Sequence, residues 1–385
     1  MQALNDNPCG RLVPAVEGQS AFVPHPLPRQ LDMSSRLSYL LEQATLAVGT
    51  LAGVGETAPN PRLFIQPFIR REAVLSSRIE GTQASLSDLF RHESDGQIYS
   101  DDVLEVSNYV TALEYGIDRL ARLPISLRLI NEVHERLLTG VRGQDKRPGE
   151  LRDEQVWIGP PGSSIKNARF IPPPPGYVRD LLYDWEKFAN ERMDMPVLVR
   201  CALMHYQIEA IHPYRDGNGR IGRLLIILFL QAQRALPAPL LYMSAYFERD
   251  RQRYYDELLN VSVNCDWERW LDYFLTGVER EARDTLERLR RVRELHTRYR
   301  EALITRRGAV SGLNLLDALF DNPFMTVPRA MGILDMTPSG ARRVLDRLIA
   351  AGIVERIDDA WRHLYVAQGI LNEIEGPVES VSNQR

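Results

Sequence analysis

The sequence predicts a mainly α-helical protein that carries two small β-hairpins. Apolar residues recur at helical spacing from about residue 32 to about residue 300, with one interruption at residues 146–176. That interruption holds two short β-prone runs, 155–158 and 168–171, around a turn rich in proline, glycine and serine. We expect a hairpin there, and a second one near the C-terminus after three short helices.

Composition indicates an ordinary globular protein of two or three domains. The 385 residues are 44% hydrophobic and 25% charged, with a formal net charge of −4. No global positive field therefore favours nucleic acid or an anionic membrane. The longest apolar run, residues 224–230, is too short to span a membrane, and no secretory signal is visible. We expect a cytoplasmic protein without a membrane partner.

The cysteines give no reason to expect cross-links. Cys9, Cys201 and Cys265 are widely spaced and odd in number, and no CxxC sequence exists. Neither a zinc site nor a disulfide framework is therefore expected.

Start and stop signals delimit the helices. An apolar stripe from Leu37 to Ala44 marks the first helix, which ends at a proline-rich turn, residues 59–61. Three more helices are expected before the central hairpin, at residues 63–81, 101–121 and 125–140.

Near the C-terminus, Thr337 and Pro338 form an N-cap and first-turn pair, and Gly352 is a helix stop. Two short strands, 353–357 and 363–367, then pair around a turn. This order of three helices and a hairpin is that of a winged helix-turn-helix domain. The expected segments are an extended N-terminal arm (1–30), an N-terminal helical region (31–122), a central core (123–276), a linking helix (277–308), the winged-helix domain (309–368) and a loose tail (369–385).

Residues 212–223 concentrate groups that bind phosphates. An apolar helix ends at His212, because Pro213 prevents its continuation. Gly217 and Gly219 then let backbone N–H groups approach an anion closely at the start of the next helix. No GK[ST] sequence is present and no strand precedes the glycines, so neither a Walker-type nor a Rossmann-type nucleotide site is expected.

The same segment supplies charge, a metal ligand and a base. Arg220 and Arg223 lie in the first turn of the second helix, where they can pair with phosphates. Asp216 offers a carboxylate suited to Mg²⁺, which prefers few carboxylates plus substrate phosphates. His212 stands at the rim, where a neutral imidazole can take a proton from a hydroxyl group.

This segment, HPYRDGNGRIGR, closely resembles the signature HPFx(D/E)GNGRxxR of the Fic family. Tyr214 stands where Phe is usual and keeps an aromatic anchor. The resemblance extends over roughly residues 30–368 and includes the hairpin QVWIG…FIPPPP and the segment YFERDRQRYYDEL. A winged-helix tail is a frequent companion of this family. The resemblance implies an all-helical Fic core with a β-hairpin flap.

Fic enzymes transfer AMP from ATP to a Ser, Thr or Tyr hydroxyl of a target protein, and the resemblance implies the same reaction here, with self-modification. It gives His212 the role of general base and Asp216 that of Mg²⁺ ligand. The Gly217–Gly219 form belongs to the adenylylating branch of the family. The ATP-binding residues that it implies in this segment are Gly217, Asn218, Gly219, Arg220, Ile221, Gly222 and Arg223.

Two further segments match parts of a Fic nucleotide site. The hairpin matches the family's flap, which covers the nucleotide and holds an extended target through main-chain bonds. In the second segment we expect one of Tyr254 and Tyr255 to contact the adenine, because adjacent helical residues cannot both face one pocket. The flap residues are Val156, Trp157, Ile158 and Gly159.

An upstream motif implies a built-in inhibitor. Ser76 and Glu80 match the family's inhibitory pattern (S/T)xxxE(G/N) and, being four residues apart, share one helix face. The resemblance implies that Glu80 pairs with Arg223 and keeps the γ-phosphate of ATP from that arginine.

Other readings stay open at this point. A Fic-fold protein that mainly removes AMP would use Glu80 to position water. A nucleotide-sensing DNA-binding regulator is a third reading, motivated by the winged helix. Between residues 329 and 362, however, the sequence has six arginines and five acidic residues. This excess of positive charge is weak for a phosphate-binding surface. A protein partner or a homodimer is an equally open use of that domain.

Overall fold

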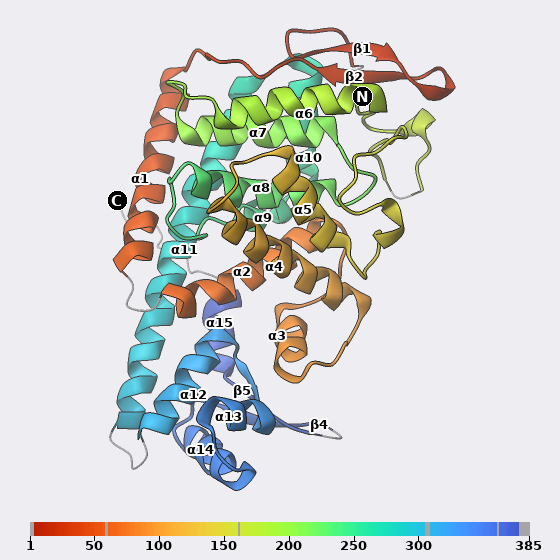
Figure 1. Ribbon diagram of the computed structural model, residues 1–385. Helices are drawn as coiled ribbons and strands as arrows, with labels where there is room; N and C mark the ends of the chain where they lie inside the picture. Colours follow the sequence, from red (N-terminus) through yellow and green to blue (C-terminus); the bar gives the residue numbers. More distant parts are fainter. Residues whose placement is uncertain (1–3, 58–60, 161, 305–308, 360–361, 377–385) are drawn as a thin grey trace.

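The structure is a computed structural model, and it confirms a mainly helical protein (Figure 1). It describes residues 4–57, 61–160, 162–304, 309–359 and 362–376. The helices before residue 305 are α1 (Ser35–Thr57), α2 (Pro61–Ile79), α3 (Leu86–Asp95), α4 (Asp101–Leu120), α5 (Leu127–Leu138), α6 (Pro175–Asn190), α7 (Val197–Ile211), α8 (Asn218–Ala232), α9 (Ser244–Arg249), α10 (Arg251–Asn264) and α11 (Trp267–Ile304), with 3₁₀ turns at Val16–Gly18, Gln144–Lys146 and Ile165–Asn167.

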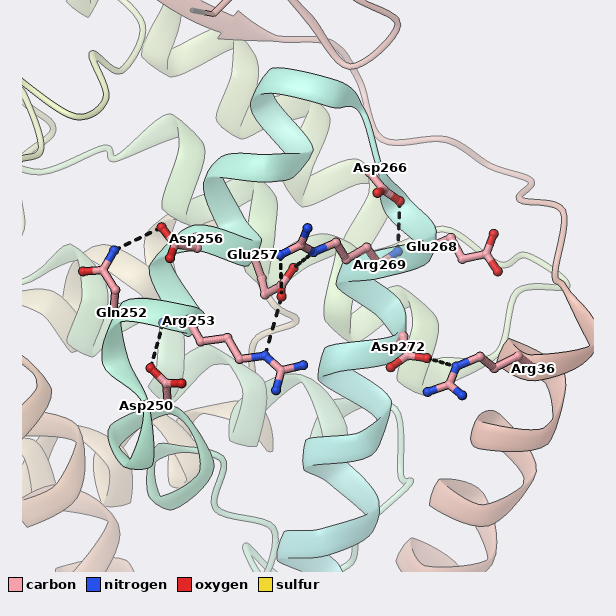
Figure 2. A pocket seen from close by; sticks show the side chains of 10 residues that line it. All are labelled: Arg36, Asp250, Gln252, Arg253, Asp256, Glu257, Asp266, Glu268, Arg269 and Asp272. Carbon is pink, nitrogen blue, oxygen red and sulfur yellow. Dashed lines mark hydrogen bonds and ion pairs between the residues drawn. The ribbon is translucent and has the colours of Figure 1, made fainter. Parts of the chain in front are cut away.

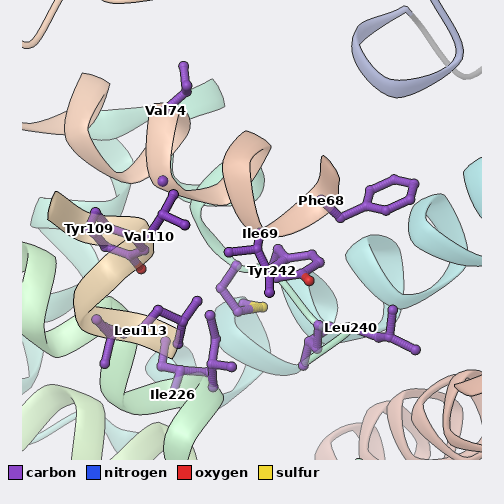
Figure 3. Close-up of a cluster of buried hydrophobic side chains, with 14 of the residues drawn as sticks. Phe68, Ile69, Val74, Tyr109, Val110, Leu113, Ile226, Leu240 and Tyr242 are labelled. Atoms are coloured by element: carbon purple, nitrogen blue, oxygen red, sulfur yellow. The ribbon is translucent and has the colours of Figure 1, made fainter. Parts of the chain in front are cut away.

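Two apolar helices, α7 and α8, form the centre of the molecule. Nearly all side chains of both helices are buried, as expected of helices that are apolar on every face. Figure 3 shows side chains of α2 and α4, among them Ile69 and Leu113, packed together with Ile226 of α8. The short turn that joins α7 to α8 is therefore held at both ends by the core.

Helix α11 is longer than the linking helix that we expected. It begins at Trp267 and runs without interruption for 38 residues to Ile304. Helix α1 lies along the first part of α11. The C-terminal end of α11 leads into a separate group of helices and strands (Figure 1). The helix thus belongs both to the central core and to the C-terminal unit.

The C-terminal unit, residues 309–376, contains the expected three helices and hairpin. Thr337 caps α14, since its hydroxyl oxygen accepts a hydrogen bond from the Gly340 N–H at 3.3 Å. A further strand, β3, joins the hairpin in an antiparallel sheet of order β3-β5-β4. The elements are α12 (Ala309–Asp321), β3 (Phe324–Thr326), α13 (Val327–Leu334), α14 (Pro338–Ala350), β4 (Glu355–Asp359), β5 (Arg362–Val366) and α15 (Gln368–Glu375). The winged-helix assignment of this unit stays a prediction.

The C-terminal unit shares its core with α2. The ring of Phe64 on α2 lies 6.3 Å from that of Phe320 on α12, and His296 of α11 contacts both rings. Asn322 also donates to the carbonyl of Phe90 on α3 at 2.9 Å. These aromatic contacts and this buried hydrogen bond pack the unit beside α2, the helix that carries Ser76 and ends next to Glu80.

Residues 1–30 are not the extended arm that we expected. Strands β1 (Gly10–Pro14) and β2 (Ser20–Pro24) form an antiparallel hairpin in which Leu12 pairs with Phe22. The prolines at positions 14 and 24 only end the strands, where a missing N–H is tolerated. Phe22 is fully buried and packs on Phe170.

A disulfide between Cys9 and Cys265 also departs from expectation. It joins the N-terminal hairpin to the end of α10, across 256 residues of sequence. Asn7 strengthens the junction by donating to the carbonyl of Ser262 at 2.8 Å. The remaining cysteine, Cys201, is buried and free. Spacing in the sequence cannot reveal a pair that only the fold brings together.

The expected loose tail, residues 369–385, is helical in its first part. Ile370, Leu371 and Ile374 of α15 are buried, and Arg288 of α11 donates to the carbonyl of Ile374 at 2.9 Å. Residues 377–385 lie outside the described residues, as do residues 59 and 60 of the expected proline-rich turn.

The central hairpin is narrower than expected. A single antiparallel bridge joins Ile158 to Phe170, and the described residues between them form no strand but include the 3₁₀ turn at Ile165–Asn167. Within the described residues, no helix is long and apolar enough to cross a membrane.

Candidate nucleotide site

The turn between α7 and α8 is built on two residues in the left-handed region. His212, at the C-terminal end of α7, has φ 51°, and Gly217, the N-cap of α8, has φ 76°. The Asn218 side chain closes the turn, since it accepts from the Tyr214 N–H at 2.8 Å and donates to the Tyr214 carbonyl at 2.9 Å. Asn218 therefore fixes the shape of the predicted anion-binding turn from within.

His134 of α5 supports the same turn, and sequence reasoning missed it. Its ring stacks on Tyr214 with 3.7 Å between centroids. Its Nδ1 accepts from the Gly149 N–H at 2.9 Å, so the proton is on Nε2, which donates to the Asp216 carbonyl at 2.9 Å. Burial lowers the pKa of His134 to about 4, which keeps the imidazole neutral. A lone histidine in an amphipathic helix carries no sequence signal for this role.

Asp216 fits a magnesium ion held mainly by substrate. Its half-buried carboxylate accepts from the Gly217 N–H at 2.6 Å through Oδ1. Among the described residues, no group of three or more acidic, histidine or cysteine side chains is placed to bind a metal. A single carboxylate suits Mg²⁺, which keeps several waters and binds substrate phosphates.

A cavity of about 580 Å³ lies over the turn. His212, Gly219 and Arg223 line it from the turn and α8. Ile158 and Gly159 of the flap line the opposite side. Of the predicted site residues at 212 and 216–223, only His212, Gly219 and Arg223 line the cavity, and two of the four predicted flap residues line it as well.

The other two flap residues do not line this cavity. Trp157 is 42% exposed, and its indole N–H donates to the Ser163 carbonyl at 2.9 Å. Val156 is half-buried beside it. Alternation along an extended segment accounts for Trp157, which is next to Ile158, but not for Val156, which would share the side of Ile158.

The adjacent tyrosines divide as expected. Tyr255 lines the cavity. Tyr254 is buried, and its hydroxyl lies 2.9 Å from Nε2 of His205 in the core. The Nδ1 of His205 lies 3.1 Å from the Gly222 carbonyl, so it carries the proton and Nε2 accepts from Tyr254.

Three predicted ATP-binding residues of α8 face protein. Ile221 is 1% exposed and belongs to the core. Gly222 lies against Glu209, whose Oε1 would be 2.2 Å from a Cβ at that position. Arg220 is buried and pairs with Glu105 of α4 at 3.3 Å. Glu105 also pairs with Arg142, and sequence reasoning missed both residues.

The expected ion pair between Glu80 and Arg223 is present. Nη2 of Arg223 donates to Oε1 of Glu80 at 2.7 Å. Nε of Arg223 donates to the Ser76 hydroxyl, and Nη2 donates to the Ser76 carbonyl, each at 2.9 Å. Burial raises the pKa of Glu80, but the charge of Arg223 and its hydrogen bond outweigh burial and leave that pKa lowered. Glu80 is therefore ionised at neutral pH.

Glu80 also covers the start of α8. A Cβ on Gly219 would lie only 2.2 Å from Glu80 Oε1 and 2.9 Å from Nη1 of Arg223. The first turn of a helix attracts anions, so the Glu80 carboxylate lies at a position that would also favour a phosphate group. Glycine at position 219 is what allows this close approach.

His212 has the protonation state of a base. Burial, followed by the nearby charge of Arg152, lowers the pKa of His212 to about 4. Its buried Nδ1 has no hydrogen-bond partner among the described residues. The ring is thus neutral at pH 7 and can accept a proton.

A second, more open pocket of about 770 Å³ lies between α1, α10 and α11 (Figure 2). Its charged side chains largely pair with one another: Arg269 with Glu257 at 2.6 Å, and Arg36 with Asp272. Gln252 lines both this pocket and the cavity over the turn, but no predicted site residue lines the second pocket.

The helical core, the glycine turn and the flap define the fold of Fic proteins. Residues 39–118 match the sequence profile described as Fic/DOC family N-terminal, and residues 124–230 match that of the Fic/DOC family. Each match covers less than a third of the chain, and the two lie next to each other between residues 39 and 230. It is similar over most of its length to a crystal structure of a Fic family protein from Desulfovibrio desulfuricans G20, with a TM-score of 0.59, 19% identity and coverage of 88% of this chain and 98% of that one.

Curated relatives resemble the chain in part. The protein adenylyltransferase fic-1 of Caenorhabditis briggsae is 34% identical over 108 residues, 28% of this chain and 19% of that protein. The probable protein adenylyltransferase aq_aa38 of Aquifex aeolicus is 28% identical over 169 residues, 42% of this chain and 48% of that protein. The protein adenylyltransferase Fic of Aedes aegypti is 34% identical over 137 residues, 35% of this chain and 24% of that protein. The chain thus spans less than half the length of each of these relatives.

Proposed function

We propose that this protein is an autoinhibited protein adenylyltransferase that transfers AMP from ATP to a Ser, Thr or Tyr hydroxyl of a target protein and of itself. The observation that carries the proposal is that His212, Gly219 and Arg223 line one cavity, with Glu80 paired to Arg223 inside it. The names of the curated relatives support the reaction class.

The chemistry follows from these positions. The neutral ring of His212 takes the proton of the target hydroxyl, and the oxygen attacks the α-phosphorus of ATP. A phosphoester bond to AMP forms as the bond to the β-phosphate breaks, and pyrophosphate leaves. Backbone N–H groups at the start of α8 favour the negative charge that builds on the α-phosphate.

Asp216 would hold Mg²⁺, which supplies charge neutralisation for the phosphates when it is bound. The edge of the flap would hold the target as an extended segment through main-chain bonds, with little demand on its sequence. We expect the reaction in the cytoplasm, where ATP is available.

Autoinhibition is the second part of the proposal. Arg223 is the arginine that would hold the γ-phosphate, and in this structure its Nε and Nη2 donate to Ser76 and Glu80. ATP entering the site would have its distal phosphates displaced from in-line geometry. A misplacement of about 1 Å can cost roughly 10²-fold in rate.

Labelling with ATP tests the reaction. The purified Glu80→Gly protein, in which the proposed inhibition is relieved, should take up label from α-labelled ATP with Mg²⁺ and a cell lysate, and none from γ-labelled ATP. Adding His212→Ala should lose about 10²–10⁴-fold of that rate, because a general base contributes that much. Adding His92→Ala instead, at a histidine on α3 outside the cavity, is the matched control. Equal labelling by Glu80→Gly with and without His212→Ala would contradict the proposal.

Removal of AMP is the alternative that Glu80 itself favours, because its ionised carboxylate lies in the same cavity as His212. Protein labelled beforehand with AMP distinguishes the two activities. Faster loss of label with the wild type than with Glu80→Gly would favour AMP removal as the main reaction.

A further inference from the structure

Arg152 is a buried arginine without a carboxylate partner among the described residues. It lies just before the flap and is 3% exposed. Its side chain donates only to backbone carbonyls, four in number: Glu154, Pro173, Ile211 and His212. A buried charge of this kind is costly, and burial lowers the pKa of Arg152 to about 10.

Two of the four carbonyls belong to the end of α7. Nε of Arg152 donates to the carbonyl of His212 at 2.8 Å, and Nη2 donates to that of Ile211 at 3.3 Å. The backbone N–H of Arg152 also donates to the carbonyl of Pro213 at 3.0 Å. The last carbonyls of a helix lack partners within the helix and favour a nearby positive charge. Arg152 thus fixes the backbone of His212 in its left-handed conformation.

The other two carbonyls belong to Glu154 and Pro173, which flank the flap segment on its two sides; we call these two positions the flap roots. Nη1 of Arg152 donates to the carbonyl of Glu154 at 3.1 Å, and Nη2 donates to that of Pro173 at 2.5 Å. Between these two residues the flap is closed by a single β-bridge. One planar guanidinium therefore ties both roots of a weakly paired flap to the residue that carries the base.

We propose that Arg152 is a positioning residue that fixes the flap and His212 relative to each other, so that a hydroxyl held on the flap meets the imidazole. The inference rests on the proposed function, in which the flap presents the target and His212 removes its proton. Lysine cannot replace it, because a single ammonium lacks the fork of donors that reaches two separate segments.

The charge of Arg152 has a second effect on the base. The groups that act on the imidazole are Arg152, which lowers its pKa, and Glu80 together with the backbone at Glu209, which raise it. Loss of the arginine charge should therefore raise the pKa of His212. An arginine that only stabilised the fold would leave that pKa unchanged.

Arg200 provides a matched control. It is 4% exposed and donates to the carbonyls of Phe188, Ala189 and Glu191, each at 3.0 Å, at the end of α6. It does not line the cavity over the turn. Replacing it removes a buried arginine of the same kind without touching the flap or His212.

The experiment compares Arg152→Lys and Arg152→Gln with Arg200→Lys and Arg200→Gln, all made on Glu80→Gly so that transfer is measurable. The Arg152 variants should bind ATP within about threefold of the parent, yet transfer AMP about 10²-fold more slowly. Hydrogen exchange in residues 154–173 should rise, and the NMR titration of His212 should move to higher pH in Arg152→Gln. The Arg200 variants should change none of these three, even where their melting temperatures fall.

Unchanged flap exchange and His212 titration in folded Arg152 variants would overturn the inference. If both Arg152 variants fail to fold, Gln155→Ala decides, since Gln155 also bridges the flap roots by donating to the Pro172 carbonyl at 2.8 Å. Because Gln155→Ala keeps Arg152, hydrogen exchange in residues 154–173 of this variant should stay at the level of the parent. Raised exchange there would refute the role of Arg152. Absence of labelling in the Glu80→Gly parent would refute the proposed function instead, while exchange and titration still decide the link between Arg152 and His212.

Discussion

Arg223 of α8 donates hydrogen bonds to Ser76 of α2 and to Glu80, which directly follows the end of that helix. One turn before Ser76 on the same face, the carboxylate of Glu72 accepts a hydrogen bond from the Ser244 hydroxyl of α9. Helix α2 is thus fixed to the core along its whole inner face. Release of Arg223 can therefore occur at the end of α2, around Glu80, or through weakening of the packing that holds α2 in place.

Replacing Glu80 tests the inhibitory role directly. Glu80→Gly removes charge and bulk from Arg223 and from the start of α8, so self-labelling with ATP should rise about tenfold or more. Glu80→Gln keeps the bulk and loses the charge, so it should raise self-labelling less than Glu80→Gly does. Glu80→Gly combined with His212→Ala should label nothing. If Glu80→Gly is folded and binds ATP but labels only at the wild-type rate, Glu80 is not the inhibitor. Some other element of the protein would then have to regulate transfer.

Ser76 should contribute a smaller share of the same restraint. Ser76→Ala leaves Nε of Arg223 buried without its acceptor, and a hydrogen bond to a charged group is worth about 1.5–3 kcal/mol. The variant should melt at a lower temperature and label at a rate between those of the wild type and Glu80→Gly. Ser94→Ala, which removes a buried serine hydroxyl from α3, controls for the loss of stability. Equal labelling by the two serine variants would show that Ser76 does not restrain Arg223.

The pH dependence of transfer should reflect the lowered pKa of His212. Protonation removes the base, so kcat/KM of Glu80→Gly should fall as the pH drops toward about 4. Above about pH 6 it should be level, because the imidazole is then fully neutral. The profile needs circular dichroism at each pH to confirm the fold. A half-maximal rate near pH 6.5, the ordinary histidine value, would mean that burial does not lower this pKa in the free enzyme.

Local signals in the sequence predicted those site residues that belong to one continuous segment. The run from His212 to Arg223 sets the turn, because proline, two glycines and the following apolar helix act within a few residues. The pairing of Glu80 with Arg223 could be expected only through the resemblance to a family. Their separation of 143 residues gives no physical signal of its own.

What could not be predicted depends on partners from distant segments. Arg220 is a phosphate-binding candidate by its place in the turn, yet its Nη1 pairs with Glu105 of α4 in the core. His134 and Arg152 support the site through backbone carbonyls, which every residue carries, so no residue type marks their partners. The Cys9–Cys265 bond likewise needs the hairpin to fold back onto α10.

That disulfide should stabilise the protein measurably. Cys9→Ser should lower the free energy of unfolding by about 2–4 kcal/mol, because the bond closes a very long loop. A dithiol reductant added to the wild type should lower the melting temperature equally, and it should have no effect on Cys9→Ser. Cys201→Ala, which removes the free buried thiol, should not abolish the response to reductant. A wild-type melting temperature that is insensitive to full reduction would contradict this prediction.

The C-terminal unit should influence the inhibitory contact through α2. Deletion of residues 309–385 would remove α12 and α15 from α2 and expose the face of α2 that they cover. A point change is the sharper test. Phe320→Ala removes a fully buried ring that contacts Phe64 and His296, at a cost of about 3–5 kcal/mol.

Leu345→Ala is the matched control for Phe320→Ala, because Leu345 is equally buried in α14 and its loss costs about 2–5 kcal/mol. If α12 helps to hold α2 in place, Phe320→Ala should raise self-labelling severalfold, and the rise should vanish in the Glu80→Gly background, where nothing is left to release. Leu345→Ala should lower the melting temperature without raising labelling. Equal labelling by both variants would mean that the C-terminal unit stabilises the fold but does not act on the pairing of Glu80 with Arg223.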